Sequence, residues 1–524
     1  MTGNFADLWE GVAARQPQAT AILHGGRRTS WASFDARAGG LAATLLAAGL
    51  QPGARVAQYL YSGPEYLETV FAAFKARLVP VNTNYRYRDD ELVYLWTNAE
   101  VAAVVFDAAF TDVVERLRVA VPEVRCWVRF GGDGACPDWA VDFEQAAATA
   151  PPAFETRSAD DLYLLYTGGT TGMPRGVMWR QGDLLGYLRT SSPTARGRYP
   201  EQDVEPGSAW THLSASPLMH GTGSFTAFQA LGVGGTVATL AGTSFDPAEL
   251  LDLVNGSGVQ TVALVGDAFC RPLIAAMDAE PDRWSLGGLR WIVSSGAMWS
   301  ADVKEALLAR NPDMLLIDSL ASSEAPGMAS AITRGGERVR TGVFHAGPAT
   351  VLLDERGASV PADGATPGLV AVSGYLPLGY HADPAKTAET FTEHDGRRYS
   401  IPGDWATLSP DGTLQLLGRG AACINTGGEK VFAEEVQTVV REHEGVADAV
   451  VVGVPDPRLG QMVVAVVEPL SPPPDPEALI RHVKSRLAGY KAPKRVIYTD
   501  RIPHGPSGKV DLQHVRALAA QEDS

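Results

Sequence analysis

Short apolar runs alternate with amphipathic stretches in the first part of the chain. The runs RVAQYLY (55–61), LVPVNTN (78–84) and AAVVFD (102–107) have the length and β-branched content of buried strands, and residues 65–77 carry helical spacing. Strands that alternate with helices in this way predict a mostly parallel, doubly wound sheet.

The same alternation returns between residues 210 and 330. Five more apolar runs predict strands, and the stretches 246–255 and 300–310 predict helices between several of them. The runs are THLSASP (211–217), GGTVATL (234–240), VQTVALVG (259–266), LRWIVSSG (289–296) and MLLIDSL (314–320). A second α/β layer is therefore expected.

The pattern changes twice towards the C-terminus. Between about 340 and 418, short segments are separated by turn signals such as SPDG (409–412), which favours antiparallel or barrel-like structure. After Gly420 a compact α+β pattern begins. It consists of helices over 434–442 and 476–487 and strands over 448–456 and 461–469.

Together these patterns predict an α/β fold with two domains. The large N-terminal domain (1–418) should contain two doubly wound sheets and a β-barrel-like piece. A hinge (419–422) should join it to a small, mobile α+β C-terminal domain (423–524).

Composition and charge narrow the function classes. The 524 residues suffice for about three domain-sized units, and the 45% apolar and 20% charged content is near the globular average. The net charge of −16 disfavours nonspecific binding to nucleic acid or anionic membrane. Since the N-terminus lacks a signal-peptide core and no run of 18 apolar residues occurs, we expect a soluble, cytoplasmic protein without a membrane span.

Cysteine and lysine usage add two points. The cysteines lack C-x-x-C spacing, so the sequence supports neither a disulfide framework nor a zinc site; they are Cys126, Cys136, Cys270 and Cys423. Only eight of the 44 basic residues are lysines, and five of those eight follow residue 419. Residues 481–509 carry eight basic side chains and one acidic one, which predicts a basic patch.

The segment YTGGTTGMPRG (166–176) carries the strongest chemical signal. It joins the apolar run LYLLY (162–166) to the strand-like VMWR (177–180). Its glycines let backbone N–H groups approach a ligand, its threonine hydroxyls add donors, and Arg175 adds a cation, as expected of a phosphate cradle. The Walker pattern G-x-x-x-x-G-K-[ST] is absent.

This loop resembles the S/T-G-T-T-G-x-P-K-G hallmark of the adenylate-forming (ANL) superfamily, which includes acyl-CoA synthetases, peptide-synthetase adenylation domains and beetle luciferases. Further signatures follow in the family's order over nearly the whole chain. The resemblance implies that ATP phosphates are held by Thr167, Gly168, Gly169, Thr170, Thr171, Gly172 and Arg175.

Two further segments resemble the family's acid and adenine sites. PLMHG (217–221) resembles the motif that lines the acid pocket, which implies that His220 lies beside the reacting acid. SGA (295–297) resembles the small-residue turn under the adenine. Contacts from Gly296 and Ala297 to the nucleotide are thus implied.

DSLASSE (318–324) corresponds to the family's Y-G-x-T-E signature. The resemblance implies that Glu324 holds Mg²⁺, with the Ser323 hydroxyl beside it, and that Asp318 accepts the adenine amino group. Leu320 replaces the usual tyrosine and removes an aromatic stack on adenine. The nucleotide-contacting residues implied here are Asp318, Ser319, Leu320 and Ser323.

The remaining signatures lie near the predicted hinge and in the C-terminal domain. YSIPGD resembles the segment whose aspartate, here Asp404, accepts both ribose hydroxyls. Arg419 falls in the hinge signature and would contact ribose or phosphate. Ala421 and Ala422 stand where many members carry a charged hinge residue, and PSGKVD carries the family's catalytic lysine, Lys509.

The resemblance implies an enzyme that activates an acid as its adenylate with ATP and Mg²⁺, releases pyrophosphate and transfers the acyl group to CoA. Bacterial fatty-acyl and sterol-side-chain CoA ligases are the most similar in motif, and the implied catalytic residues are Lys509, His220 and Glu324. The expected partners are a small-molecule acid, CoA or another small acceptor, and a second copy of the chain in a homodimer.

Two other functions stay open at this point. The same adenylation step could serve nitrite activation and diazotisation of an aromatic amine in natural-product biosynthesis. A nucleotide-binding protein without catalysis is the second alternative, although the joint presence of Glu324, Asp404, Arg419 and Lys509 argues against it.

Overall fold

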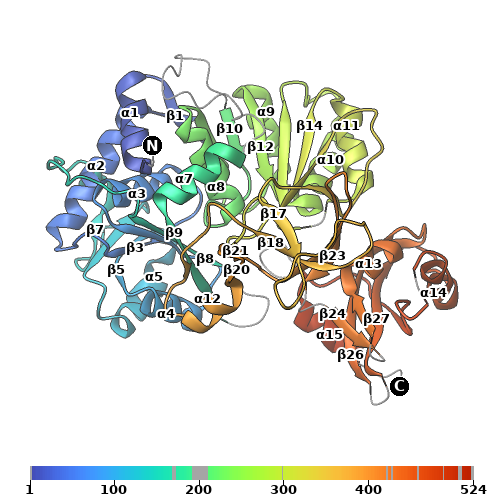
Figure 1. Cartoon of the computed structure of the whole chain (residues 1–524). Coiled ribbons are helices and arrows are strands. Elements are labelled where there is room, and N and C mark those ends of the chain that lie inside the picture. Colours follow the sequence, from blue (N-terminus) through green and yellow to red (C-terminus); the bar gives the residue numbers. More distant parts are fainter. Residues whose placement is uncertain are drawn as a thin grey trace.

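The computed structural model describes residues 3–167, 173–191, 211–297, 299–419, 423–426, 429–456, 459–487, 489–504 and 510–520. Figure 1 shows a large N-terminal domain and a smaller C-terminal domain, coloured red, at one side of it. The predicted α/β class with a large and a small domain is therefore confirmed. The first residue of the predicted hinge, Arg419, is the last residue of strand β23, and residues 420–422 of the hinge lie outside the described ranges.

The first sheet has eight strands in the order β19-β9-β8-β4-β3-β5-β6-β7. It is parallel from β8 to β7, whereas β9 and β19 join it antiparallel. Its strands are β3 (Arg55–Tyr59), β4 (Val79–Asn82), β5 (Val101–Asp107), β6 (Cys126–Phe130), β7 (Val141–Asp142), β8 (Leu162–Thr167), β9 (Arg175–Arg180) and β19 (Gly379–Tyr380). The apolar runs at the start of the chain thus form its centre.

The second sheet contains 15 strands. Its parallel part runs in the order β1-β11-β10-β12-β13-β14, with β2 antiparallel at the edge. These strands are β1 (Thr20–His24), β2 (Arg27–Ser30), β10 (Thr211–Ser214), β11 (Thr236–Thr239), β12 (Val259–Leu264), β13 (Trp291–Ser295) and β14 (Leu315–Leu320). The sequence pattern predicted all of them except β1 and β2, which come from the N-terminus.

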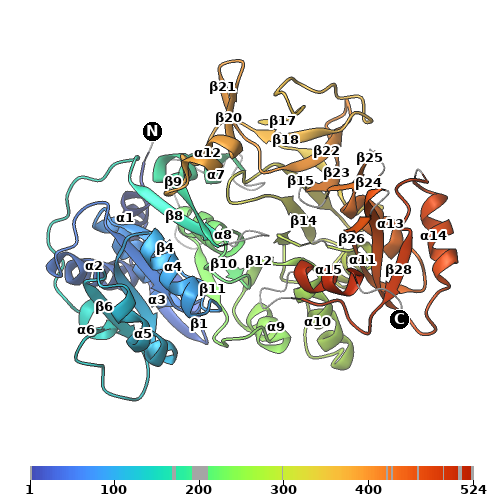
Figure 2. The same ribbon diagram turned by 90° about the horizontal axis from the view of Figure 1, so that it is seen from below.

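Antiparallel strands continue the second sheet beyond β14. The sequence predicted antiparallel or barrel-like structure after about residue 340, but neither the connection to the second sheet nor β15, which begins at residue 329. The antiparallel strands follow in the order β15-β16-β23-β22-β18-β21-β20, with β17 beside β18. Figure 2 shows them on one side of the molecule, between the first sheet and the C-terminal domain. They are β15 (Ala329–Thr333), β16 (Val343–Ala346), β17 (Thr350–Leu353), β18 (Gly368–Val372), β20 (Phe391–His394), β21 (Arg397–Ser400), β22 (Asp404–Leu408) and β23 (Thr413–Arg419).

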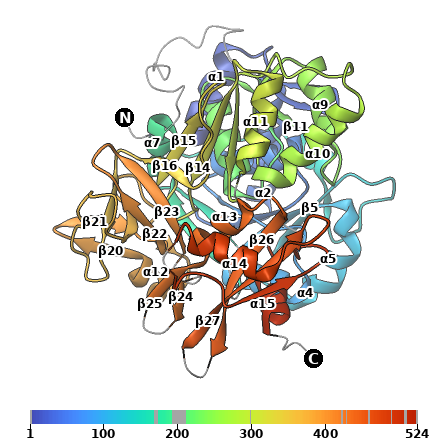
Figure 3. The ribbon, with the colours of Figure 1, turned by 90° about the vertical axis from the view of Figure 1, so that its right-hand side faces the viewer.

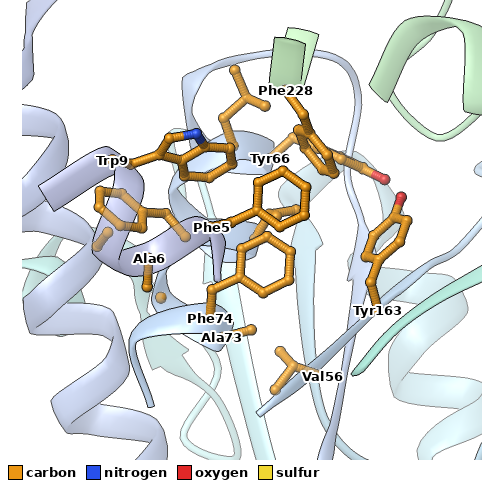
Figure 4. Close-up of a cluster of buried hydrophobic side chains, with 14 of the residues drawn as sticks. Phe5, Ala6, Trp9, Val56, Tyr66, Ala73, Phe74, Tyr163 and Phe228 are labelled. Atoms are coloured by element: carbon orange, nitrogen blue, oxygen red, sulfur yellow. The ribbon is translucent and has the colours of Figure 1, made fainter. Parts of the chain in front are cut away.

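A layer of helices lies between the two sheets and supplies the main core. It consists of α1 (Phe5–Arg15), α2 (Trp31–Ala47), α3 (Pro64–Lys75) and α8 (Gly221–Gly232). In this layer Phe5 stacks on Phe74 at 5.2 Å between ring centroids, and Trp9 meets Phe228 edge-on at 5.5 Å (Figure 4). Burial of large aromatic side chains stabilises such a layer strongly.

Other helices cover the outer faces of both sheets, which confirms the doubly wound arrangement. On the first sheet these are α4 (Asp89–Asn98), α5 (Thr111–Leu117) and the short turn η1 (Ala108–Phe110). The turn η2 (Arg118–Ala120) follows α5 and buries no residue. On the second sheet they are α9 (Pro247–Gly256), α10 (Gly266–Ala279) and α11 (Ala301–Arg310). The remaining helices of this domain are α6 (Phe143–Ala147), α7 (Gln181–Ser191) and α12 (Pro384–Thr390).

The C-terminal domain is a five-stranded sheet with helices on both faces. The strands are β24 (Cys423–Thr426), β25 (Glu429–Phe432), β26 (Val446–Asp456), β27 (Gly460–Pro469) and β28 (Arg495–Tyr498), in the order β25-β24-β27-β26 with β28 beside β27. Helices α13 (Ala433–Arg441) and α14 (Pro476–Lys484) cover one face and α15 (Leu512–Ala520) the other.

The two domains touch beside the predicted hinge. Figure 3, with the C-terminal domain facing the viewer, shows α13 on the side of the large domain, where it contacts β23. The rings of Trp405 and Phe432 face each other across this contact at 5.8 Å. Within the described ranges, no helix is long and apolar enough to cross a membrane.

Candidate active site

The parallel strands β12, β13 and β14 bring their carboxyl ends to one edge of the second sheet. Ligands of doubly wound sheets bind at such edges. Gly296 follows β13 with a φ of +88°, a conformation that side chains other than glycine rarely adopt. The Ser295 hydroxyl donates a hydrogen bond to the Ser319 carbonyl at 2.9 Å. The structure therefore brings the predicted adenine turn, with Ala297, next to the β14 residues predicted to contact the nucleotide.

The predicted phosphate loop is anchored by two antiparallel strands. Thr167 ends β8 and lies opposite Arg175, which begins β9. Arg175 Nε donates to Asp383 Oδ2 at 3.1 Å, and Asp383 also accepts from the Lys386 N–H at the start of α12. Asp383 thus fixes the direction of the Arg175 side chain. The other loop residues, Gly168, Gly169, Thr170, Thr171 and Gly172, lie outside the described residues.

The buried amide of Asn82 links this loop to the predicted acid motif. Its Nδ2 donates to the carbonyls of Tyr166 and Met219 at 2.8 and 2.7 Å, and its Oδ1 accepts from the Tyr166 N–H at 2.6 Å. His220 follows Met219 and stands at the N-terminal end of α8, half-buried. Asn82 was not predicted from the sequence, although this amide ends the otherwise apolar strand β4.

Glu324 is held by a tyrosine that sequence analysis also missed. The Tyr380 hydroxyl donates to Glu324 Oε1 at 2.7 Å. Burial, together with the Glu324 carboxylate, raises the pKa of Tyr380, so the hydroxyl stays protonated and remains a donor. Next to Glu324, the Ser323 carbonyl accepts from Trp179 Nε1 at 3.2 Å. Because Tyr380 and Asp383 lie three residues apart, one short segment positions both the expected metal ligand and Arg175.

The surroundings of Glu324 fit the expected Mg²⁺. Tyr380 occupies only one of the two carboxylate oxygens, and carboxylate oxygen is a hard ligand of the kind that Mg²⁺ prefers. In the part of the chain that the structure describes, no group of three or more His, Cys, Asp or Glu side chains could hold a metal.

The contacts that Asp318 and Leu320 of β14 make could not be predicted from the sequence. Asp318 is buried, and its Oδ2 accepts a hydrogen bond from Lys304 Nζ on α11 at 2.9 Å. Leu320 packs against the core of the antiparallel strands, which contains Ala325 and Met328. No aromatic ring therefore stands at position 320 to stack on adenine.

The predicted ribose site lies where the large domain ends. Asp404 is buried at the start of β22 and pairs in register with Arg419, the last residue of β23. The preceding Gly403 has a φ of +100°, which turns the chain sharply into the strand. Lys509, the predicted catalytic lysine, and the hinge alanines Ala421 and Ala422 lie outside the described residues.

Fewer cations of the basic patch in the C-terminal domain are available to bind an anion than its charge count predicted. Three of its cations form ion pairs with acidic neighbours, which reduces the positive field that they present. The pairs are Arg481 with Asp475 at 3.5 Å, Arg486 with Glu442 at 3.2 Å and Lys491 with Glu435 at 2.7 Å. The exposed side chains of Lys484 and Lys494 are the better candidates for a phosphate-bearing acceptor.

Comparison with known proteins confirms the family resemblance. Residues 9–381 match the family described as AMP-binding enzyme, and residues 435–509 match the AMP-binding enzyme C-terminal domain. The chain belongs to the AMP-binding enzyme family. The second match includes Lys509, and the first covers the sites around Glu324 and Arg175.

Two curated relatives of this AMP-binding enzyme match it over nearly its full length. The 3-oxocholest-4-en-26-oate–CoA ligase of Rhodococcus rhodochrous is 35% identical over 98% of this chain and 95% of its own. The medium-chain acyl-CoA ligase Mig of Mycobacterium avium is 37% identical over 97% of this chain and 96% of its own.

Solved structures agree with the fold. ATP-bound MatB from Rhodopseudomonas palustris has a TM-score of 0.80 at 28% identity and covers 98% of this chain and 99% of its own. The amide bond synthetase McbA from Marinactinospora thermotolerans has a TM-score of 0.83 at 25% identity, with the same coverage of both chains. The fold of this enzyme therefore also occurs in a protein that is named as an amide bond synthetase.

Replacing Arg175 by lysine should lower the rate of ATP-dependent adenylation by less than about tenfold, because an ammonium supplies the same charge at the loop and Asp383 remains as its partner. Replacing Arg175 by methionine, which removes the cation, should lower the rate about 10²-fold. Pyrophosphate exchange at varied ATP concentration measures both. A lysine variant as slow as the methionine variant would contradict a phosphate-binding role.

Proposed function

We propose that this AMP-binding enzyme is an acid:CoA ligase that converts an apolar carboxylic acid and ATP into an acyl-adenylate and pyrophosphate. In the second step the acyl group passes to CoA and AMP is released. Relatives that match 97–98% of the chain bear names of CoA ligases for a sterol acid and for medium-chain acids. This observation carries the proposal and favours CoA over an arylamine as the acceptor, so diazotisation is not favoured.

The described residues can be assigned roles in the first step. A carboxylate becomes a good acyl donor only after its oxygen attacks the α-phosphate, so the enzyme must gather several negative charges. In this proposal Arg175 and the loop that begins at Thr167 hold the β- and γ-phosphates, and Asp404 orients the ribose. Bound through Glu324, magnesium would neutralise phosphate oxygens during the attack.

The acid is proposed to lie beside His220, at the start of α8. Asn82 ties the backbone before His220 to the strand that leads into the phosphate loop. This link fixes the distance between the acid site and the phosphate site. Such positioning of two reactants is worth several orders of magnitude in rate.

Lys509 completes the proposed first step. Its ammonium would lie between the attacking carboxylate and the α-phosphate, and rotation about the hinge at 419–422 would then remove it and present CoA. The boundaries 1–418 and 423–524 remain predictions, as do a homodimer and a cytoplasmic location.

Pyrophosphate exchange over a panel of acids tests the proposal. The panel should include medium-chain fatty acids, a sterol side-chain acid and nitrite, and AMP release should then be measured with CoA or with an arylamine. We expect exchange with an apolar carboxylic acid and AMP release that requires CoA. Activity that requires nitrite and an arylamine would establish the diazotase, and absence of AMP with every acid would leave a nucleotide-binding protein.

A further inference from the structure

A buried ion pair lies beneath the predicted adenine site. The side chain of Lys304 is 1% exposed, and its Nζ lies 2.9 Å from Oδ2 of Asp318, whose side chain is 11% exposed. The ammonium also lies 5.6 Å from the ring centroid of the buried Trp299. A buried lysine is costly unless a hydrogen-bonded anion compensates its charge, and Asp318 supplies that anion.

Lys304 is the nearest compensating charge for Asp318. Helix α10 contributes a second carboxylate, Asp267, which has its own partner in Arg271 at 3.2 Å. The neighbouring strands place Ser294 and Ala331 opposite Asp318. Neither of these two side chains carries a charge. Burial raises the pKa of Asp318, and the Lys304 ammonium opposes that rise because it favours the ionised carboxylate.

An ionised carboxylate distinguishes purines by their 6-substituent. A carboxylate only accepts hydrogen bonds, so it pairs with the 6-amino group of adenine and repels the 6-oxo group of hypoxanthine. A protonated carboxyl group has an O–H that can donate to the 6-oxo group. The charge state of Asp318 would therefore decide which nucleoside triphosphate binds.

We propose that Lys304 is a positioning residue for nucleobase selection, which holds Asp318 as an ionised acceptor with its Oδ1 directed to the amino group of ATP. Oδ2 is already taken by Lys304, so the pair also fixes the rotation of the carboxylate. This inference rests on the proposed use of ATP and on the predicted role of Asp318 as acceptor of the adenine amino group. The simpler alternative is that the pair only fastens α11 to β14.

The substitution Lys304→Met separates these two roles, with ATP and inosine triphosphate (ITP) as probes. Methionine has a similar volume but no charge, so the pKa of the buried Asp318 carboxyl should rise further and its protonated form should gain population. Relative to the wild type, the ratio of ATP to ITP affinity at pH 7 should fall about tenfold or more. Because the carboxylate re-forms as pH rises, the ATP preference should increase again as the pH of the titration is raised. Calorimetric binding titrations without acid substrate measure the ratio.

Lys75 offers a matched control in another layer of the fold. It is also buried, and its Nζ lies 2.6 Å from Glu10 and 2.7 Å from Asp35. Lys75→Met should lower thermal stability and leave the ATP:ITP ratio unchanged at every pH. A fall in the ratio for this control equal to that of Lys304→Met would overturn the inference.

A second variant guards against misfolding of the first. The double substitution Lys304→Met with Asp318→Asn removes both buried charges, and since an amide donates as well as accepts, the ATP preference should be lost at all pH values. An unchanged, pH-independent ratio in either folded variant would overturn the inference and leave the proposed function intact. A wild type that binds neither nucleotide would overturn both.

Discussion

Replacing Lys509 by alanine should slow acyl-adenylate formation by about 10²–10³-fold, the usual cost of removing a charge aimed at a transition state. Transfer from supplied acyl-adenylate to CoA should slow much less, because the proposed rotation removes Lys509 from the site before that step. Pyrophosphate exchange measures the first step, and thioester formation from synthetic acyl-adenylate measures the second. Equal losses in both steps would contradict the assignment.

Two further variants sharpen the test of Lys509. Lys509→Arg should also fail, because a planar guanidinium cannot replace a compact ammonium that enters and leaves a crowded site. Lys494→Ala, at an exposed lysine of the same domain, should leave adenylation unchanged. If Lys509→Arg fails while Arg175→Lys is tolerated, the cations at positions 509 and 175 have different roles in the reaction.

Replacing Glu324 by glutamine should lower the adenylation rate about 10²-fold and raise the Mg²⁺ concentration needed for half-maximal rate. The amide keeps the volume and one oxygen acceptor for Tyr380, so the loss should reflect the missing charge and not a collapsed site. Pyrophosphate exchange in a Mg²⁺ titration measures both quantities. An unchanged Mg²⁺ requirement would exclude Glu324 as the metal ligand.

Tyr380→Phe should give a smaller effect of the same kind. It removes one hydrogen bond to a charged acceptor and leaves the carboxylate in place, so we expect a loss of about tenfold. A larger loss of adenylation rate for Glu324→Gln than for Tyr380→Phe would support Glu324 as the metal ligand and Tyr380 as the residue that positions it.

The buried strands could be read from the sequence because their apolar runs have the length of strands and lie between amphipathic helices. The strand β1 could not, since TAILH is short and its partner β11 lies far along the chain. Contacts between residues that are far apart in the sequence were also missed at the candidate active site. Asp383 contacts Arg175 across 208 residues and Tyr380 contacts Glu324 across 56, and pattern along a chain carries no information on such pairs.

The scarcity of lysine in the large domain was visible in the sequence, but the positions of these lysines in the fold were not. Three lysines precede residue 419, and two of them, Lys75 and Lys304, are buried in ion pairs. Both ammonium groups lie within 2.9 Å of a carboxylate oxygen, and an ammonium is a more compact cation than the forked guanidinium of arginine. The third, Lys386, pairs with Glu389 on the surface of α12.

The pairing of the N-terminal strand β1 also determines how late this part of the chain can fold during synthesis. It pairs with β11, and His24 Nδ1 lies 2.9 Å from Thr239 Oγ1 although 215 residues separate them. At synthesis rates of about 5–20 residues per second, β1 and the aromatic faces of α1 and α3 must wait for many seconds on the ribosome before β11 and α8 emerge to cover them. During that interval these aromatic side chains of the nascent chain are not yet covered, and chaperone binding should concentrate there.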